Sequence, residues 1–456
     1  MSSTLRMKPE DVDTREKRAK YTITITSCEQ DSLLYSCLFA DAGYSVICTD
    51  RDQTLVNLVA KGRVQLPQHE TEITLKNHVR KGHIIATDDA KTAISKGNII
   101  IINTPPEIDQ RKKPDYSNLE KTVRLLGANI RPDSLVIITS TVGVGVIEGL
   151  IRETLENTSG FRIGAEIGLA YSPIRNPNMK ASEKELAQEQ IVAATDKTSL
   201  NAASTVLETI SQGTLKRTLS VGAAETAALF EAAHREVKSA LANEFAVFCE
   251  KAGVDYFEAQ KLRTQESATL SSLAHSDART EDTSYLLLED AENLSVKLRI
   301  VAMATEANGE TARHAANLVG DALRNCGRTF RRAKVSILGI SEMPNVKSPP
   351  KRLVKKLAKI METRGAKISV YDPYFSNESA DAGRPVKKTL TEALEGANCI
   401  VLITPHDQFK RLSFNKLKAV MKMPAAIVDL TGVLEPDKVE KEGLLYRGLG
   451  RGVWKK

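Results

Sequence analysis

Two series of short apolar segments, separated by one long stretch without helix breakers, constrain the fold of this chain most strongly. Residues 98–103 (NIIIIN) and 134–139 (SLVIIT) are almost wholly apolar, as is typical of parallel strands buried on both faces. Residues 223–252 contain neither proline nor glycine and favour one long helix. We therefore expect an α/β region, a helical region and a second α/β region.

The first series opens with a strand, a helix and a strand within about 30 residues, the size of a parallel βαβ unit. Residues 21–26 alternate apolar and polar side chains, residues 32–42 have helical spacing that ends at Gly43, and residues 45–49 form the next strand. Further strands are expected at residues 98–103, 134–139, 167–171 and 190–195. The pattern predicts a doubly wound α/β sheet.

The second series follows another helical stretch, residues 285–323, and a basic segment at 328–334. Its expected strands are residues 334–340, 367–371, 399–404 and 425–430, with a helix at 350–363. The predicted fold class is α/β, with two Rossmann-like doubly wound domains joined by a central helical region. The predicted domains are a basic N-terminal lead-in (1–20), a first Rossmann-like domain (21–215), a central helical domain (216–327) and a second Rossmann-like domain (328–456).

The composition narrows the class of protein. The 64 Lys and Arg residues exceed the 57 Asp and Glu residues by seven, which is too small a surplus to indicate a nucleic-acid binder. No run of about 18 apolar residues exists to span a membrane, and residues 1–20 lack the apolar core of a secretory signal. The cysteines form no C-x-x-C pair and the histidines show no metal-ligand spacing. We therefore expect reduced thiols, a cytoplasmic location and no metal.

Several short strings occur in a specific order and at specific distances. They are Thr104-Pro-Pro, Pro114-Asp-Tyr, Ser140-Thr-Val-Gly-Val-Gly, Leu169-Ala-Tyr-Ser-Pro-Ile-Arg, Ala224-Glu225, Tyr371-Asp-Pro and Tyr446-Arg-Gly-Leu-Gly-Arg. Each string is weak evidence alone. Together, over residues 21–452, they resemble the UDP-glucose/GDP-mannose dehydrogenase family, and most closely its UDP-N-acetylmannosamine dehydrogenase branch.

The resemblance implies an NAD-dependent oxidoreductase of polysaccharide biosynthesis that oxidises C6 of a UDP-sugar twice, through a cysteine thioester. It implies NAD in the first Rossmann-like domain, a UDP-sugar at the last one and a dimer formed by the central helices. Residual cofactor contacts are expected at Asp50, Thr104, Pro105 and Thr141. Each of these has a structural alternative, such as a turn at a strand end for Asp50 or a fixed strand exit for Pro105.

The phosphate-binding turn departs from the family pattern. Where the family has G-x-G-x-x-G directly after the first strand, this chain has Ser27-Cys-Glu29-Gln-Asp31-Ser32. The second glycine of that motif lets the backbone approach a pyrophosphate. Glu29 places a negative side chain there instead, and Asp31 adds a second carboxylate. Like charges at close range repel, so we expect NAD binding to be weak or absent.

The catalytic positions depart as well. Counting from Tyr285, the family's thioester cysteine corresponds to Arg279, and no cysteine lies between Cys249 and Cys326. The family's lysine and asparagine on the long helix correspond to Ala228 and Ala232, and its glutamate of the S-P-E-R string to Ile174. Without a thiolate, no covalent thiohemiacetal can form. We therefore predict no convincing catalytic residue.

The substrate clamp of the last domain is also altered. The segment at residues 341–349 is shorter than its family counterpart and lacks the lysine and arginine that hold the substrate. Asp429-Leu-Thr-Gly likewise lacks the arginine of the family's D-x-R string.

Three functions remain open from the sequence. The first is a non-catalytic family member that acts as a binding or regulatory subunit, binds a UDP-sugar or another nucleotide, and forms a homodimer or a heterodimer with an intact paralogue. The second is an active NAD-dependent UDP-N-acetylmannosamine or UDP-glucose 6-dehydrogenase with a rebuilt site. The third, a basic scaffold for a polyanion, rests only on residues 328–334 and the basic C-terminus. The missing catalytic groups place the first function ahead of the second, and the polyanion scaffold comes last. No membrane partner is expected.

Overall fold

The computed structural model describes residues 3–64, 66, 69–174, 189–262, 278–375, 379–380 and 384–451. The chain forms two compact units, one of residues 1–231 with 285–296 and one of residues 232–284 with 297–456. The division into four domains predicted from the sequence stays a prediction.

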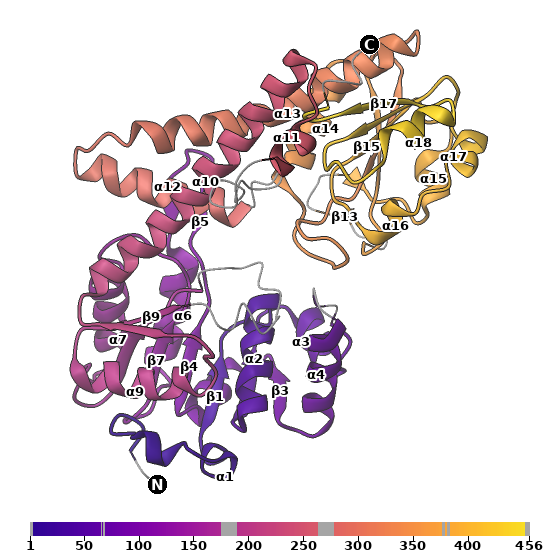
Figure 1. Cartoon of the computed structure of the whole chain (residues 1–456). Helices are drawn as coiled ribbons and strands as arrows, with labels where there is room; N and C mark the ends of the chain where they lie inside the picture. The colour runs from indigo at the N-terminus through magenta and orange to yellow at the C-terminus, as the bar shows by residue number, and fades with distance from the viewer. Residues whose placement is uncertain are drawn as a thin grey trace. The chain divides into compact units, whose positions relative to one another are not determined.

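An eight-stranded sheet forms the centre of the first unit (Figure 1). Its order is β10-β9-β8-β7-β4-β1-β2-β3, and every neighbouring pair is parallel except β8 with β9. The strands are β1 (Thr22–Ile25), β2 (Ser45–Thr49), β3 (Ile84–Thr87), β4 (Ile99–Ile102), β7 (Leu135–Ile138), β8 (Gly168–Tyr171), β9 (Gln190–Ala194) and β10 (Leu215–Thr218). The predicted doubly wound α/β fold is confirmed. The reversal at β9 was not predicted, because an apolar run does not encode strand direction.

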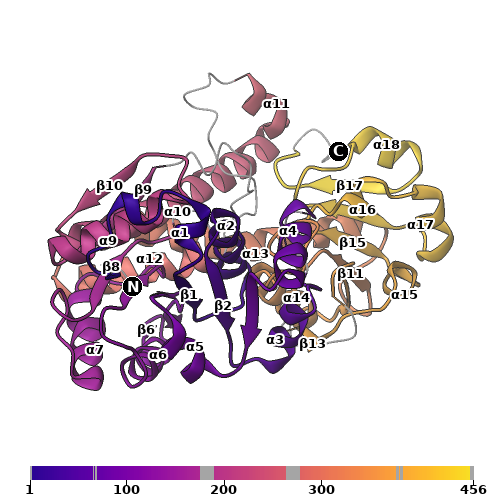
Figure 2. The same ribbon diagram turned by 90° about the horizontal axis from the view of Figure 1, so that it is seen from below.

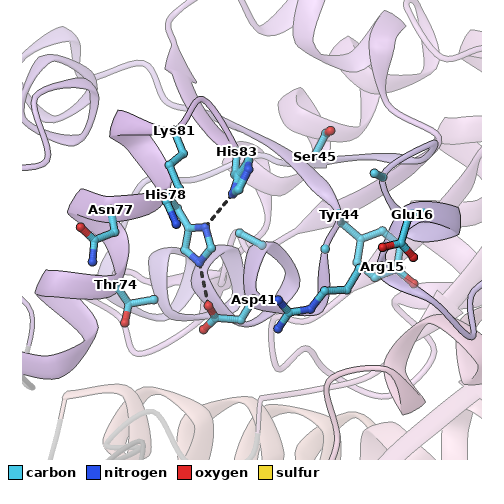
Figure 3. A pocket seen from close by; sticks show the side chains of 13 residues that line it. Arg15, Glu16, Asp41, Tyr44, Ser45, Thr74, Asn77, His78, Lys81 and His83 are labelled. Carbon is cyan, nitrogen blue, oxygen red and sulfur yellow. Dashed lines mark hydrogen bonds and ion pairs between the residues drawn. The ribbon is translucent and has the colours of Figure 1, made fainter.

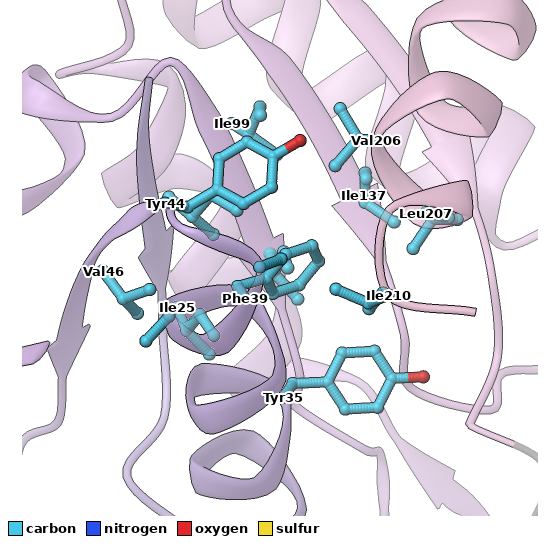
Figure 4. Close-up of a cluster of buried hydrophobic side chains, with 14 of the residues drawn as sticks. Ile25, Tyr35, Phe39, Tyr44, Val46, Ile99, Ile137, Val206, Leu207 and Ile210 are labelled. Atoms are coloured by element: carbon cyan, nitrogen blue, oxygen red, sulfur yellow. The ribbon is translucent and has the colours of Figure 1, made fainter. Parts of the chain in front are cut away.

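Helices cover both faces of this sheet. They are α2 (Gln30–Ala42), α3 (Gln53–Ala60), α4 (His69–Arg80), α5 (Ala90–Lys96), α6 (Ser117–Gly127), the short π-helix η2 (Ile147–Ile151), α7 (Arg152–Ser159) and α9 (Lys197–Glu208). Successive residues of β4 enter different cores: Ile99 packs with residues of α2 and α9, and Ile100 with residues of α6 and α7. Figure 4 shows the first of these cores around Phe39. This alternation explains why the strand is apolar throughout.

The N-terminal segment packs onto the same unit. It contains a 3-10 turn at Pro9–Asp11 and the short helix α1 (Arg15–Arg18). The backbone N–H of Thr4 donates to Oδ2 of Asp133 at 2.7 Å, and Leu5, Met7 and Val12 are buried. The predicted basic lead-in therefore contributes apolar side chains to the core.

The second unit contains a five-stranded, wholly parallel sheet of order β12-β11-β15-β16-β17 (Figure 2). Its strands are β11 (Lys334–Leu338), β12 (Lys367–Tyr371), β15 (Cys399–Leu402), β16 (Ala426–Asp429) and β17 (Leu445–Gly448). The surrounding helices are α14 (Arg352–Thr363), α15 (Leu390–Leu394), α16 (Asp407–Lys410), α17 (Phe414–Val420) and α18 (Pro436–Lys441). Two-stranded ribbons pair β5 (Glu107–Ile108) with β6 (Pro114–Asp115), and β13 (Ser379–Ala380) with β14 (Arg384–Pro385).

The helical region consists of α10 (Val221–Ala252), α11 (Tyr256–Lys261), α12 (Ala278–Asn293) and α13 (Arg299–Asn325). The single long helix predicted at 223–252 is confirmed. The stretch predicted as helical at 285–323 consists of two helices, because the chain leaves the helix after Asn293 and Ser295 takes a φ of 59°. Within the second unit, α10 packs beside α13. Asn308 donates to Oε1 of Glu236 at 2.8 Å, and Asn243 donates to Asn308 at 3.0 Å.

Candidate functional site

The first candidate position is the turn that joins β1 to α2. Glu29 is the N-cap residue of α2, with φ −69° and ψ 166°, and its side chain is exposed. The positive-φ residues of the described chain all lie outside residues 27–32, so this turn needs no glycine for its backbone. The structure thus places a carboxylate at the helix N-terminus, where a pyrophosphate would sit. These residues do not fit the usual pose of NAD.

Asp50 follows β2 and braces the same turn. Its Oδ2 accepts the backbone N–H of Cys28 at 2.8 Å, and its Oδ1 accepts that of Asp52 at 3.0 Å. Both carboxylate oxygens are therefore engaged by the chain itself. A ribose contact by Asp50 stays a prediction, and its structural role as a turn brace is what the geometry shows.

The other predicted cofactor residues lie at the carboxyl ends of neighbouring strands. Thr104, half-buried, and Pro105, exposed, follow β4, and Thr141, half-buried, follows β7. Ligands of doubly wound sheets bind at this edge. The sequence analysis missed Asn103, which is buried and donates from Nδ2 to Oγ of Ser32 at 3.1 Å. A polar residue at the end of an apolar run was the available signal.

Glu225 of α10 holds the loop that follows β7. It is fully buried, and its two oxygens accept the backbone N–H groups of Gly145 at 2.8 Å and Ile147 at 2.9 Å. Burial raises the pKa of Glu225 to about 7, although these two hydrogen bonds act in the opposite direction. Its carboxyl group therefore changes charge near neutral pH.

Two further side chains accept hydrogen bonds from this loop. The hydroxyl of Tyr116 accepts the N–H of Gly143 at 3.0 Å, and Oδ2 of Asp290 on α12 accepts the N–H of Val144 at 2.8 Å. Burial raises the pKa of Asp290. Asp290 lies 146 residues from its partner, so no local sequence pattern predicts this contact.

The positions that match the family's catalytic residues are apolar wherever the structure describes their side chains. Ala228 and Ala232 are buried on α10. Ile174 packs, partly buried, against the core beside α2 and α9. Arg279 belongs to α12, and its side chain lies outside the described residues. The absence of acid, base and amide groups at 174, 228 and 232 follows from the sequence.

The thiols are inaccessible. All six cysteines of the sequence are free and buried. Burial raises the pKa of each thiol, including that of Cys28 in the first turn and that of Cys48, which rises to about 11. A buried, protonated thiol is a poor nucleophile.

The corresponding edge of the second sheet is held by Asp372, which follows β12 and is fully buried. Its Oδ2 accepts the N–H groups of Ile340 at 2.8 Å and Ser341 at 2.9 Å, and Nε2 of His406 at 3.0 Å. Nδ1 of His406 accepts the N–H of Asn345 at 2.8 Å. Both ring nitrogens of His406 are therefore engaged in hydrogen bonds within the chain.

Lys351 is a positive group at this edge that the sequence analysis missed. It is buried just before α14, and Nζ donates to the carbonyl of Ile403 at 3.2 Å. Burial lowers its pKa to about 8. Asp429, which begins the altered D-x-R string, accepts the N–H groups of Thr431 and Gly432 instead. The family's arginine is absent here, and the carboxylate of Asp429 instead accepts hydrogen bonds from the turn that follows it.

Among the described residues, no three or more His, Cys, Asp or Glu side chains form a group that would hold a metal ion. None of the described helices combines the length and apolar character needed to cross a membrane.

Comparisons with known proteins match parts of both α/β regions to domains of one family. Residues 32–211 match the NAD binding domain of the UDP-glucose/GDP-mannose dehydrogenase family, and residues 336–436 match the UDP binding domain of the same family. The chain is 26% identical to UDP-N-acetyl-D-mannosamine dehydrogenase of Pyrococcus horikoshii over 91% of this chain and 96% of that protein. It is 24% identical to UDP-glucose 6-dehydrogenase of Rhizobium meliloti over 94% of this chain and 99% of that protein.

Solved structures show the same fold. The structure of the Pyrococcus horikoshii UDP-D-ManNAc dehydrogenase aligns with a TM-score of 0.82 at 25% identity, covering 95% of this chain and all of that one. A UDP-glucose dehydrogenase from Pyrobaculum islandicum aligns with a TM-score of 0.79 at 18% identity, covering 94% of this chain and 98% of that one. The match to the NAD binding domain begins at Ser32, the last residue of the altered first turn.

Proposed function

Because the chain belongs to the UDP-glucose/GDP-mannose dehydrogenase family, we propose that it is a non-catalytic member that binds a nucleotide or nucleotide sugar as a binding or regulatory subunit. The observation that carries this proposal is the state of the thiols. No cysteine lies between Cys249 and Cys326, and all six cysteines are buried. The thioester route that the family resemblance implies therefore has no nucleophile.

The alanines on α10 support the same proposal. Ala228 and Ala232 stand where the family has a lysine and an asparagine, and neither carries a polar atom to stabilise an oxyanion or orient a water molecule. The nucleophile, the oxyanion stabiliser and the group that orients water act in the same reaction, and this chain lacks all three at the family positions. Such losses are non-additive, because removing one group of a set that acts together already costs most of the rate.

The first turn supports weak NAD binding. Residues 32–211 carry the family's NAD binding domain, yet the exposed carboxylate of Glu29 lies at the N-terminus of α2. A pyrophosphate in the usual position would meet a like charge there. We propose that NAD, the cofactor of the family, binds this chain poorly.

The ligand proposal rests on the second unit. Residues 336–436 match the UDP binding domain, and Lys351 supplies a buried cation at the carboxyl edge of its sheet. A UDP-sugar or another nucleotide is the proposed ligand class. Calorimetric titration with UDP tests this part on its own, and absence of saturable heat would contradict it.

The partner proposal rests on α10. Its exposed apolar side chains include Phe230, Leu241, Phe245 and Phe248, and Phe248 is 70% exposed. Spacings of 11, 4 and 3 residues follow from these numbers and place them along one face of the helix. Leu229, another apolar residue of this helix, is instead buried within the chain. We propose a homodimer, or a heterodimer with an intact paralogue, through this face.

An active enzyme with a rebuilt site is the second candidate, and one observation favours it. Glu225 lies buried beside the edge of the first sheet with a pKa of about 7, which suits a general base at neutral pH. Reduction of NAD in the presence of UDP-sugars separates the two candidates. The non-catalytic proposal expects none.

A further inference from the structure

A pocket lies at the edge of the first sheet where the strands begin, opposite the edge with the predicted cofactor residues Asp50, Thr104 and Thr141. Figure 3 shows the side chains that line this pocket. The pocket has a volume of about 520 Å³ and is lined by residues of α1, α2 and α4 and by the starts of two strands. Ser45 is the first residue of β2, and His83 directly precedes β3. Because these strands are parallel, their starts share the edge away from Asp50.

The end of α4 fixes two histidines in this pocket. The N–H of His83 donates to the carbonyl of His78 at 2.9 Å, the N–H of Gly82 donates to that of Val79 at 3.1 Å, and Gly82 has a φ of 75°. These bonds define a Schellman motif, which brings together the side chains on either side of the turn. The pair is normally apolar, and here it consists of two imidazoles.

The two rings face each other through the same type of nitrogen. Nδ1 of His78 lies 3.1 Å from Nδ1 of His83. On its other side, Nε2 of His78 lies 2.7 Å from Oδ1 of Asp41, near the end of α2. When Asp41 accepts the proton of Nε2, Nδ1 of His78 carries a lone pair directed at His83. Figure 3 shows this chain of three side chains.

We propose that His78 and His83 bind a divalent transition-metal ion such as Zn²⁺ through their Nδ1 atoms, with Asp41 orienting His78. Two imidazole nitrogens on a tetrahedral zinc, each at about 2.0–2.1 Å, lie about 3.3 Å apart. The observed separation of 3.1 Å is within a small movement of that value. A carboxylate on the distal nitrogen of a ligating histidine is the usual support of such a site.

The rest of the coordination shell comes from outside this pair. The described residues contain no group of three or more metal-ligating side chains, so water or a small ligand in the pocket completes the shell. Arg15 and Lys81 line the same pocket and suit an anionic ligand beside the metal. Imidazole donors select Zn²⁺, Ni²⁺ or Cu²⁺ over Mg²⁺ and Ca²⁺.

Calorimetric titration of the untagged full chain with Zn²⁺ tests the proposal. We expect saturable binding that Mg²⁺ does not displace. His83→Ala removes one ligand and abolishes saturation, and Asp41→Asn weakens binding by about 10–100-fold. His234→Ala, at an exposed histidine of α10, serves as the matched control and leaves binding unchanged.

Two results overturn the proposal. One is no saturable Zn²⁺ heat with the wild-type chain. The other is equal binding by the wild type and His83→Ala, which would place the metal elsewhere and leave the two rings as a simple hydrogen-bonded pair. Circular dichroism checks that His83→Ala is folded. If it is not, Asp41→Asn decides, because unchanged affinity in that variant contradicts the site as well.

Discussion

The carboxylate of Asp50 and the backbone of Cys28 are joined by a hydrogen bond of 2.8 Å that ties the end of β2 to the turn after β1. The second sheet repeats this arrangement, because Asp372 after β12 accepts the N–H of Ile340 after β11, also at 2.8 Å. In both sheets, an aspartate at the end of the second strand holds the first turn. The aspartate that the family resemblance assigns to a ribose therefore has a structural function in this chain.

Asp50→Ala is expected to destabilise the first unit. Removing the acceptor leaves the N–H groups of Cys28 and Asp52 without a partner, which costs about 1–3 kcal/mol for a buried group. Thermal denaturation should show a lower midpoint for this variant. Asp88→Ala, at an exposed carboxylate next to β3, is the control and should lie within about 0.5 kcal/mol of the wild type. Equal midpoints for wild type and Asp50→Ala would contradict the bracing role.

NAD affinity is expected to be millimolar or weaker, which corresponds to only about 4 kcal/mol. Removing the charge of Glu29 should strengthen it, because a helix N-terminus favours the negative pyrophosphate. We therefore expect Glu29→Gln and Glu29→Gly to bind NAD more tightly than wild type in calorimetry. Glu29→Gln isolates charge from size. Micromolar binding by the wild type would refute the electrostatic account.

Glu225 is expected to make stability depend on pH. Its pKa rises from the ordinary 4.5 to about 7 in the folded chain, so the folded state binds more protons than the unfolded state between these values. Its contribution is fully present below about pH 4.5 and is lost as the pH rises through 7.

The measurement is the difference in stability between wild type and Glu225→Gln across this range. Glu225→Gln has no carboxyl group that titrates in this range. Its free energy of unfolding is lowered by an amount that does not change with pH, because its amide NH₂ group faces a backbone N–H. The advantage of the wild type should shrink by about 3 kcal/mol from pH 4.5 to pH 8. A difference that stays constant with pH would contradict the raised pKa.

Phe248→Asp is expected to dissociate the proposed dimer. Because Phe248 is 70% exposed in the single chain, the substitution should leave the fold intact and act only on association. Light scattering should give the mass of two chains for wild type and of one chain for the variant. Lys355→Asp, at an exposed lysine of α14, is the control. A wild-type mass of one chain, unchanged by an added paralogue, would rule the dimer out.

The sequence predicted the regular strands closely and the broken helix poorly. Residues 45–49 and 367–371 coincide with β2 and β12, because buried strands are apolar and bounded by turns. The break between α12 and α13 contains neither glycine nor proline (LSVKL), so no local signal marked it. Ser295 takes its positive φ at the end of α12, where its N–H donates to the carbonyl of Glu292 at 2.9 Å and the N–H of Val296 donates to that of Ala291 at 2.8 Å, as in a Schellman motif.

Some residues of the candidate site could likewise be predicted from the local sequence pattern, and others could not. Glu29 was predictable because its place between a strand and a helix follows from local pattern. The contacts of Asp290 with Val144, and of Glu225 with Gly145, join residues far apart in the sequence, and only the folded chain brings them together. His78 and His83 are only five residues apart, so their contact is local. It was not predicted, because the Schellman motif that brings the two rings together was not recognised in the sequence.

Formation of NADH from UDP-N-acetylmannosamine or UDP-glucose tests the central claim most directly. The purified chain should give no signal above a blank without enzyme, at an NAD concentration that saturates an active family member run as the positive control. The reason is that it has no cysteine between Cys249 and Cys326 and that its six thiols are buried. Heat-sensitive NADH formation that rises with protein concentration would contradict the account. Two NADH per sugar would further show that the second oxidation proceeds without the family's thiol.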